Sequence, residues 1–248
     1  MAHLCRALCL ALSLGLAAPA LADTSDVAAP SDEGFPGTLS INATYTSDYR
    51  FRGVSQTKES WAPQWGMDWS HESGLFVGMW GSRINFGGDE WVEQDIYAGF
   101  AGSVGRLSYD LSACYFYYPR EGSLNYWEYI ANTSLDLGFA SLKLGGVYSP
   151  DYLNFLGDGY YVSTGLEIPL PLDLPYGVSL SLDGTIGLTK TEEVIFEDDD
   201  YVDWNIGLVL SLPRGLSLDL RYVDTDVDDV DDADRSFVAG LGVEWSFD

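Results

Sequence analysis

The feature that most constrains this chain is a two-residue alternation of apolar and polar side chains that recurs from residue 38 onward. In "LSINATYTSDYRF", residues 39–51, nearly every second residue from Leu39 is apolar or aromatic, and the residues between are polar. The same alternation returns in "RLSYDLSACYFYY", "GVSLSLDGTIGL" and "SFVAGLGVEWSF". Because successive side chains of a β-strand point to opposite faces, each such segment predicts a strand with one apolar face. The chain is therefore expected to be all-β.

Twelve segments of this kind can be marked, and the connections between them alternate in length. Tight turns such as "HES", "SVG" and "PRG" alternate with longer polar loops. An even number of strands of about 9 to 11 residues, with short turns at one end and long loops at the other, is typical of outer-membrane barrels. Both chain ends would then lie at the periplasmic end. The expected strands cover residues 38–51, 60–70, 74–84, 91–102, 106–118, 126–138, 140–149, 159–169, 176–188, 201–212, 215–224 and 236–247.

A soluble β-sandwich or lipocalin-like barrel also has alternating strands, and the amount of apolar surface separates it from a membrane barrel. The apolar faces of twelve strands are more than the interior of a simple packed barrel holds. Tyrosine and tryptophan, for example Trp61, Trp65, Trp127 and Trp245, gather near strand ends, where they would form interfacial girdles. We therefore expect a closed antiparallel transmembrane β-barrel of about 12 strands, set in outer-membrane lipid with its polar face toward the lumen.

The N-terminal segment has the features of an export signal. Residues 1–22 contain Arg6, the apolar run "ALCLALSLGLAAP" and a closing "ALA", which together predict a signal peptide cleaved before Asp23. Residues 23–36 are acidic and contain proline, and are expected to form a flexible leader, so that residues 37–248 form the barrel domain. The 38 acidic residues against 12 basic ones would repel nucleic acid, and no nucleic-acid partner is expected.

Five stretches resemble a known bacterial family: "SDYRFRGVSQT" (47–57), "GLFVGMWGS" (74–82), "EQDIYAGFAG" (93–102), "LSYDLSACYFYYP" (107–119) and "NYWEYIA" (125–131). They are similar to the Gcw_chp family, also called the TorF family, whose members carry the provisional label of porin. The resemblance runs from about residue 41 to the C-terminus, and the opening motif is its most specific part. It implies an outer-membrane barrel of poorly defined function and brings no catalytic or ligand residues.

The C-terminal strand departs from the usual ending of such barrels. They commonly finish on an aromatic residue that the barrel-assembly machinery reads, whereas here Phe247 is followed by Asp248. We expect this machinery to recognise the strand with its signal shifted by one residue.

The polar faces of the strands supply the candidate site residues, and acids outnumber bases there about three to one. These charges either interlock as salt bridges that plug the barrel or line a narrow water path. A barrel of about eight strands has room only for side chains and one of about sixteen leaves an open channel, so twelve strands are expected to leave a restricted one. Both possibilities for the charges stay open. The lumen and constriction candidates are Asp48, Arg50, Arg52, Asp68, Glu93, Asp95, Asp110, Glu128, Arg221 and Glu244.

Two arginines, Arg50 and Arg52, stand at the outer end of the first expected strand in an otherwise acidic chain. Both side chains are expected to project into the lumen near its outer mouth. Asp48, Asp68 and Glu244 are their candidate carboxylate partners. The two arginines either brace the barrel wall or form a charged constriction that filters solutes.

Acidic tracts fall in two expected outer loops, "EDDDYVD" (197–203) and "DTDVDDVDDAD" (224–234). Carboxylates such as Asp224, Asp226 and Asp228 suit weak binding of Ca²⁺ or Mg²⁺, but neither tract has the EF-hand pattern, and a solvated loop is the expected state. No resident metal or cofactor is expected.

Enzymatic chemistry is not indicated by the residues that would have to perform it. His71 is the only histidine after the signal peptide and falls in a tight turn, and Cys114 has no basic neighbour in sequence to activate it. Two function classes therefore remain. One is a channel for passive passage of small solutes, which prefers cations because carboxylates line a narrow bore. The alternative is a non-conducting barrel with a structural or surface-binding role through its acidic loops.

Overall fold

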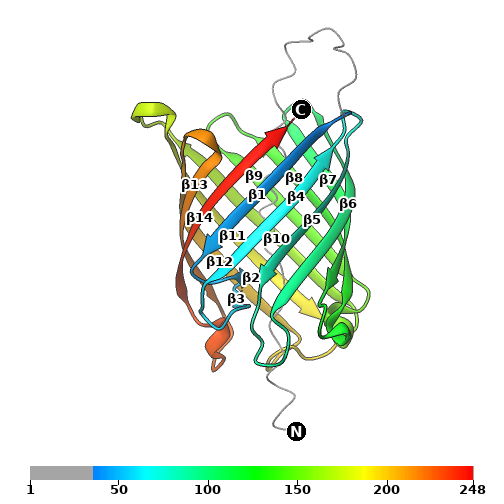
Figure 1. Ribbon diagram of the computed structural model, residues 1–248. Coiled ribbons are helices and arrows are strands. Elements are labelled where there is room, and N and C mark those ends of the chain that lie inside the picture. Colours follow the sequence, from blue (N-terminus) through cyan, green and yellow to red (C-terminus); the bar gives the residue numbers. More distant parts are fainter. Residues whose placement is uncertain (1–35, 248) are drawn as a thin grey trace.

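A computed structural model describes residues 36–247 of the chain, which form a closed β-barrel (Figure 1). Within this range twelve strands make the wall, each antiparallel to its neighbours, and the barrel closes where the last strand pairs with the first. The expected fold class and strand number are thus confirmed. The wall strands are β1 (Thr38–Thr46), β4 (Ala62–Ser70), β5 (Leu75–Arg83), β6 (Val92–Val104), β7 (Leu107–Tyr117), β8 (Tyr126–Asp136), β9 (Ser141–Ser149), β10 (Gly159–Leu170), β11 (Ser179–Thr191), β12 (Asp200–Ser211), β13 (Leu216–Thr225) and β14 (Ser236–Phe247).

The connections are short at one end of the barrel and long at the other, as the sequence predicts (Figure 1). The short-turn end holds the start of β1 and the end of β14, since Leu39 pairs with Phe247. Single-turn 3₁₀ segments lie at both ends: η4 (Pro175–Gly177) and η5 (Pro213–Gly215) in short turns, and η2 (Gly122–Leu124), η3 (Tyr152–Asn154) and η6 (Asp231–Ala233) in long loops. The expected signal peptide, residues 23–35 of the expected leader and Asp248 lie outside the described residues.

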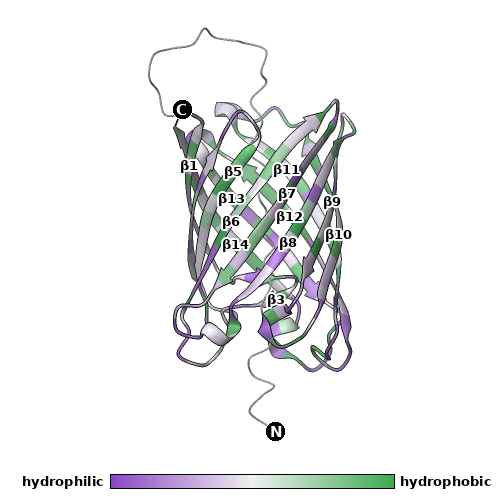
Figure 2. Ribbon diagram, turned by 90° about the vertical axis from the view of Figure 1, so that its right-hand side faces the viewer, coloured by the Kyte–Doolittle hydropathy of each residue, from purple (hydrophilic) through white to green (hydrophobic). Residues whose placement is uncertain are grey.

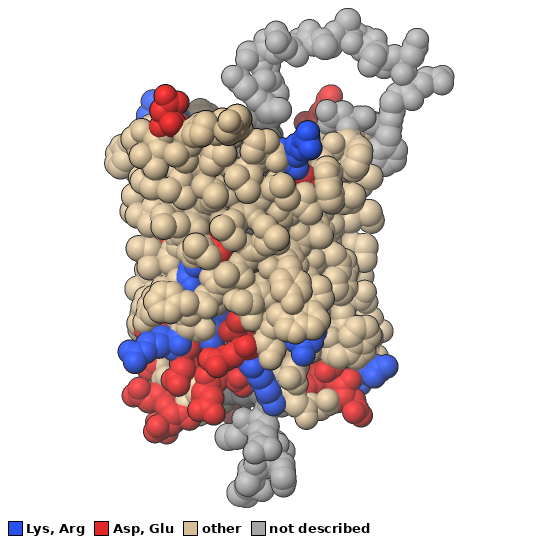
Figure 3. Space-filling view, turned by 60° about the vertical axis from the view of Figure 1, so that its left-hand side comes forward, with Lys and Arg blue, Asp and Glu red and all other residues tan. Residues whose placement is uncertain are grey.

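Strand alternation places apolar side chains on the outside of the barrel. On β10, for example, Tyr160, Val162 and Leu166 are exposed, and Figure 2 shows hydrophobic and hydrophilic residues mixed along the strands. In Figure 3 the middle of the barrel is a belt with few charged residues, and acidic and basic side chains gather at the long-loop end. An apolar belt around a barrel without free strand edges suits hydrocarbon as its solvent. The protein is therefore an outer-membrane barrel surrounded by lipid, as expected. No helix in residues 36–247 is long and apolar enough to cross a bilayer.

The first strand is shorter than its sequence pattern predicts. The alternation predicts a strand over 38–51, but β1 ends at Thr46 and residues 47–61 form a loop. In this loop β2 (Arg50–Phe51) and β3 (Val54–Ser55) pair as a small hairpin. Arg52 and Gly53 join them with φ angles of +45° and +85°, the left-handed conformations that tight hairpin turns use. The alternation does continue through residue 51, but its last residues belong to the small β2–β3 hairpin and not to β1.

The remaining strands lie close to their predicted ranges. The largest difference is on β11, which was expected at 176–188 and spans Ser179–Thr191. Pro175 and Tyr176 are used by the preceding turn, where Tyr176 has a φ of +64°, so the strand begins later than its apolar pattern indicates.

Candidate functional site

The candidate site is the outer half of the lumen, where the loop after β1 folds inward (Figures 1 and 2). Every residue from 48 to 57 is buried, and this segment is called the plug hairpin below. Phe51 and Val54 of the plug hairpin belong to one apolar cluster with Phe116 on the wall and with Leu153 and Ile195 in two outer loops. The "SDYRFRGVSQT" motif is therefore the folded core of a plug.

The carboxylate of Asp48 accepts hydrogen bonds that hold the plug hairpin together. Its Oδ2 accepts a hydrogen bond from Arg50 Nε at 2.5 Å, and its Oδ1 accepts from Ser55 Oγ at 2.7 Å and Thr57 Oγ1 at 2.8 Å. Because each of these residues comes from the same short segment, the motif supplies the partners that its buried charge requires. The predicted pairing of Arg50 with Asp48 is confirmed.

Arg50 also fastens one of the acidic outer loops to the plug hairpin. Its Nη1 donates to the carbonyl oxygens of Gly53, Asp232 and Asp234 at 3.1, 3.0 and 2.8 Å, and its Nη2 donates to Glu59 at 3.2 Å. These hydrogen bonds join Arg50 to backbone carbonyls of the second acidic tract.

Arg52 binds the barrel wall. Its Nη2 donates to Glu128 Oε1 on β8 at 2.9 Å, and the two side chains are only 3% and 2% exposed. The guanidinium carbon also lies 4.8, 5.5 and 4.4 Å from the ring centres of Phe51, Tyr152 and Tyr161. An ion pair buried among aromatic rings holds both charges in place, and either charge left alone there would be strongly destabilising.

Glu93 on β6 is the second wall residue that holds the plug hairpin. Tyr49 Oη donates to Glu93 Oε1 at 2.7 Å, and Tyr118 Oη donates to Oε2 of the same carboxylate. Burial, together with the charge of Glu93, raises the pKa of both tyrosines well above its ordinary value, so both hydroxyls remain protonated donors. Tyr49 also packs edge-on against Trp80 of β5, with ring centres 5.3 Å apart.

Asp95 lies two residues after Glu93 on the same lumen-facing side of β6 and is fully buried. Neither of its carboxylate oxygens has a hydrogen-bond partner among the described residues. The sequence-predicted residues brought together at the plug are thus Asp48, Arg50, Arg52, Glu93, Asp95 and Glu128.

The other four predicted residues face the lumen away from the plug hairpin. Asp68 accepts from Tyr97 Oη at 2.5 Å, and Asp110 accepts from the Asn132 amide at 3.3 Å. Glu244 lies on β14, in register with Asn42 of β1. The expectation that Asp68 and Glu244 pair with Arg50 or Arg52 is wrong, because the chain leaves the wall after Thr46 and carries both arginines into the plug.

On the short-turn side of the plug, ion pairs link lumen-facing side chains of several wall strands. Arg221 on β13 donates to Asp183 at 2.6 Å and to Asp219 at 2.9 Å, and Lys143 on β9 lies 2.7 Å from Glu167 on β10. The side chains of Lys143 and Glu167 are 46% and 40% exposed, so this half of the lumen is accessible to solvent. It is a wet vestibule that opens toward the short-turn end.

Aromatic residues that hold the plug were missed by the sequence argument. Tyr49 and Phe51 were expected on the lipid-facing side of the first strand, but both are buried inside the barrel. Tyr152, in an outer loop, and Tyr161, on β10, form part of the cage around Arg52. The signal that could have revealed the plug was the glycine directly after Arg52, because a positive-φ turn ends a strand.

Carboxylates of the second acidic tract accept hydrogen bonds from residues of the wall strands β12 and β13. Asp224 accepts from Tyr222 Oη at 2.6 Å, and Asp226 accepts from the Val202 amide at 2.7 Å. Within residues 36–247 no group of three or more acidic, histidine or cysteine side chains has the arrangement of a metal site. His71 lies in the turn after β4 and contacts Ser73.

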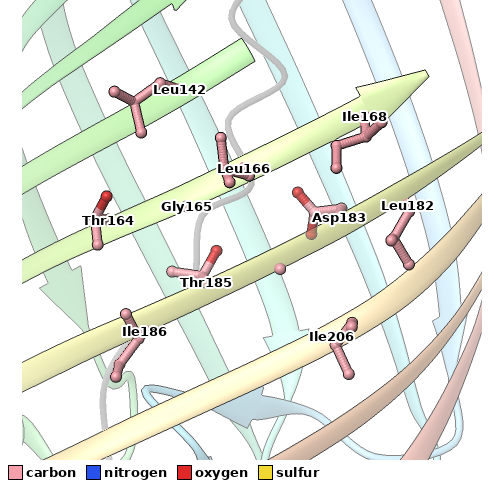
Figure 4. A pocket seen from close by; sticks show the side chains of 11 residues that line it. Leu142, Thr164, Gly165, Leu166, Ile168, Leu182, Asp183, Thr185, Ile186 and Ile206 are labelled. Carbon is pink, nitrogen blue, oxygen red and sulfur yellow. The ribbon is translucent and has the colours of Figure 1, made fainter. Parts of the chain in front are cut away.

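A shallow apolar depression lies on the outside of the barrel, apart from the lumen (Figure 4). It surrounds Gly184 of β11, and its walls include Leu166, Ile186 and Ile206, which are 44%, 50% and 52% exposed. These side chains are on the lipid-facing side of their strands, so lipid chains can fill the depression.

The fold and this site define a class: an outer-membrane β-barrel whose first outer loop forms a plug in the lumen. The sequence matches the profile described as "Bacterial protein of unknown function (Gcw_chp)" over residues 30–241. The chain belongs to the Gcw_chp family, in agreement with the resemblance of its motifs. The search of curated proteins found no match.

Solved porins have a similar barrel. The KdgM porin superimposes with a TM-score of 0.55 at 9% sequence identity, covering 84% of this chain and 99% of that one. The NanC porin gives 0.54 at 8% identity, covering 84% and 98%. A KdgM porin in complex with disordered oligogalacturonate gives 0.55 at 8% identity, covering 85% and 99%. At such low identities the likeness concerns the fold alone.

Proposed function

We propose that this protein is an outer-membrane channel for passive passage of small solutes, that its bore is narrowed by the plug hairpin, and that it prefers cations. The observation that carries the proposal is the contrast between the two halves of the lumen. The outer half is filled by the buried plug hairpin, whereas the opposite half holds partly exposed charged side chains such as Lys143 and Glu167. A path of this form excludes large solutes at the plug and admits small hydrated ones to the vestibule.

The charges of the vestibule support a preference for cations. Its two bases, Lys143 and Arg221, already lie against Glu167, Asp183 and Asp219. Among the described residues, the further carboxylates of Asp68, Asp110 and Glu244 form no ion pair with a basic side chain, so the wall carries excess negative charge. Fixed charges in a narrow bore act across a low-dielectric wall, which strengthens their effect on passing ions. The oligogalacturonate found with KdgM is a polyanion, and this vestibule would repel it.

Reversal potentials in a planar bilayer under a salt gradient test this proposal. We expect wild-type protein to conduct with cation preference, and Asp110→Asn combined with Glu244→Gln to reduce that preference, because two vestibule charges are removed. Glu72→Gln is the matched control, since Glu72 lies exposed in the turn after β4 and outside the lumen. Anion preference in the wild type would contradict the charge argument.

A second function is favoured by the complete burial of the plug. Arg52, Glu93 and Glu128 are all less than 5% exposed, so the outer half of the lumen is tightly packed. A barrel that never conducts would serve envelope structure or bind ligands through its acidic loops. Absence of conductance from protein shown to be folded and inserted would favour this alternative.

We also infer that the barrel-assembly machinery recognises β14, which ends with the lipid-facing Phe247 at 54% exposure. On either function the barrel acts without catalysis: Cys114 is buried in the wall, and His71 lies in a short turn. Retention of transport after substitution of both residues would support this non-enzymatic role.

A further inference from the structure

Three carboxylates lie at the contact between the plug hairpin and the wall, and their surroundings differ. Glu128 has the Arg52 guanidinium, and Glu93 has two tyrosine hydroxyls. Asp95 is as deeply buried, yet neither of its oxygens has a donor or contact with solvent. One of the three acids is therefore left without any group that would stabilise its negative charge.

The groups that face Asp95 come from each element packed around it. Its own strand, β6, contributes Glu93 and Tyr97, and β7 contributes Cys114. Beyond these, Glu128 of β8, Tyr118 after β7 and Tyr49 of the plug hairpin lie within electrostatic reach.

No basic side chain is among the groups that face Asp95 in the described residues. Arg52 of the plug hairpin is paired with Glu128. The two acids Glu93 and Glu128 repel a further negative charge. Asp95 is therefore surrounded by groups that oppose its ionisation.

The plug hairpin covers Asp95. Asp95 is directly opposite Trp80 in the pairing of β5 with β6, and Tyr49 packs edge-on against the same tryptophan. Tyr49 is in turn bonded to Glu93, two residues before Asp95. Water can reach Asp95 from the outer side only if Tyr49 and the rest of the plug hairpin move.

An ionised carboxylate without hydrogen bonds is among the most costly groups to bury, whereas its neutral form is tolerated at much lower cost. The closed arrangement therefore requires a proton on Asp95. If that proton is lost, the charge requires water, which reaches the outer side of Asp95 when the plug hairpin withdraws.

We propose that Asp95 is a proton-operated latch: the plug hairpin is seated while Asp95 is protonated and is released when Asp95 ionises. The closed state binds this proton and the open state gives it up to solvent, so raising the pH favours the open state. Linkage to a single proton changes the ratio of open to closed barrels by up to about tenfold per pH unit. This inference concerns motion of the plug and holds whether or not the barrel conducts.

The chain contains a probe for the test. Cys114 lies on β7, beside Tyr97 of β6 and Glu128 of β8, and is fully buried. The experiment labels the full-length protein in liposomes with a membrane-impermeant maleimide between pH 5 and pH 8. The modified Cys114 peptide is quantified by mass spectrometry. Each rate is divided by the rate for unfolded protein at the same pH, which removes the pH dependence of the thiol reaction.

We expect the normalised rate at Cys114 to rise with pH in the wild type, and to stay low at every pH in Asp95→Asn, which resembles the protonated acid. Asp95→Leu, which removes the polar group, should also stay low and serves if the asparagine variant does not fold. Asp136→Asn is the matched control, because Asp136 lies exposed at the short-turn end of β8, away from the plug hairpin, and it should keep the wild-type rise.

Two outcomes would overturn the latch. A normalised rate in the wild type that does not change with pH would show that the plug is not linked to a proton. An undiminished rise in folded Asp95→Asn would show that another group is responsible. Conductance recorded in parallel separates this inference from the channel proposal: a rise in labelling without conductance at any pH supports the latch and contradicts the channel.

Discussion

Arg50 and Arg52 are two residues apart, yet their surroundings give them different roles. Arg50 bonds within the plug hairpin and to two carbonyls of an outer loop, and one of its acidic partners, Glu59, is 56% exposed. Arg52 forms its ion pair with Glu128 of the wall, and that pair is almost completely buried. Loss of Arg52 therefore leaves the Glu128 charge buried in the wall. Loss of Arg50 leaves the buried Asp48 carboxylate with only the hydroxyls of Ser55 and Thr57, and it also releases the outer loop.

We predict that Arg52→Ala lowers the free energy that holds the plug hairpin against the wall by about 3 to 5 kcal/mol, because Glu128 would remain as an uncompensated buried charge. Trypsin added to the outer side should then cleave at Arg50 or Lys58 much faster than in the wild type. Adding Glu128→Gln to this variant should recover part of the protection. Arg106→Ala is the control, since Arg106 is exposed in a short turn. Equal protection of wild type and Arg52→Ala would refute the structural role of the pair.

The plug hairpin is the element that distinguishes this barrel from an empty one. Its turn depends on Gly53, whose φ is +85° and which lies against the wall. A Cβ added at Gly53 would lie 2.3 Å from Thr225 Cγ2 and 3.0 Å from Asp203 Cβ. The turn therefore requires glycine at residue 53 for two reasons: its backbone conformation and its close approach to the wall.

We predict that Gly53→Ala displaces the plug hairpin and leaves the barrel wall intact. The matched control is Gly138→Ala in a short turn, where φ is +88° and an added Cβ has no neighbour within 4 Å. Both variants carry a left-handed strain of about 1 to 2 kcal/mol, but only the first adds a collision. Conductance and trypsin cleavage of the loop should rise in Gly53→Ala alone. A similar change in both variants would mean that backbone strain, not contact with the wall, controls the plug.

The whole molecule combines a closed hydrogen-bonded wall with an acidic long-loop end (Figure 3). Closure leaves every wall strand paired on both sides, so the backbone polar groups of the wall have partners inside the lipid. The contact between β1 and β14 completes the wall, and Leu39 and Phe247 lie together at its short-turn end.

For the whole barrel we predict a folded form that migrates faster on a detergent gel than the boiled form, and that is recovered with outer membranes. Phe247→Ala should lower the yield of this fast form, because β14 would be recognised less well during assembly. Phe237→Ala is the control: Phe237 is also an exposed aromatic of β14, but it is far from the chain end. Recovery of the wild type as a soluble periplasmic protein would contradict the membrane fold.

The sequence alone determined the wall. A period of two fixes which side chains share a face, and the excess of apolar residues on one face requires lipid outside, so β6, β12 and β14 could be placed from pattern alone. The inward direction of Glu93, Asp95 and Glu128 followed from the same parity. These are local properties, since each depends on neighbours along one strand.

The tertiary structure decided what fills the lumen. Tyr49 and Phe51 continue the alternation of β1, so no local signal separates a longer strand from a hairpin that turns inward. The choice depends on partners distant in sequence: Glu93 for Tyr49 and Glu128 for Arg52. A charge can be buried without a large cost only where a side chain of opposite charge or a hydrogen-bond donor lies beside it. These partners come together only when the barrel closes. The wall is thus encoded strand by strand, whereas the plug exists only in the closed barrel.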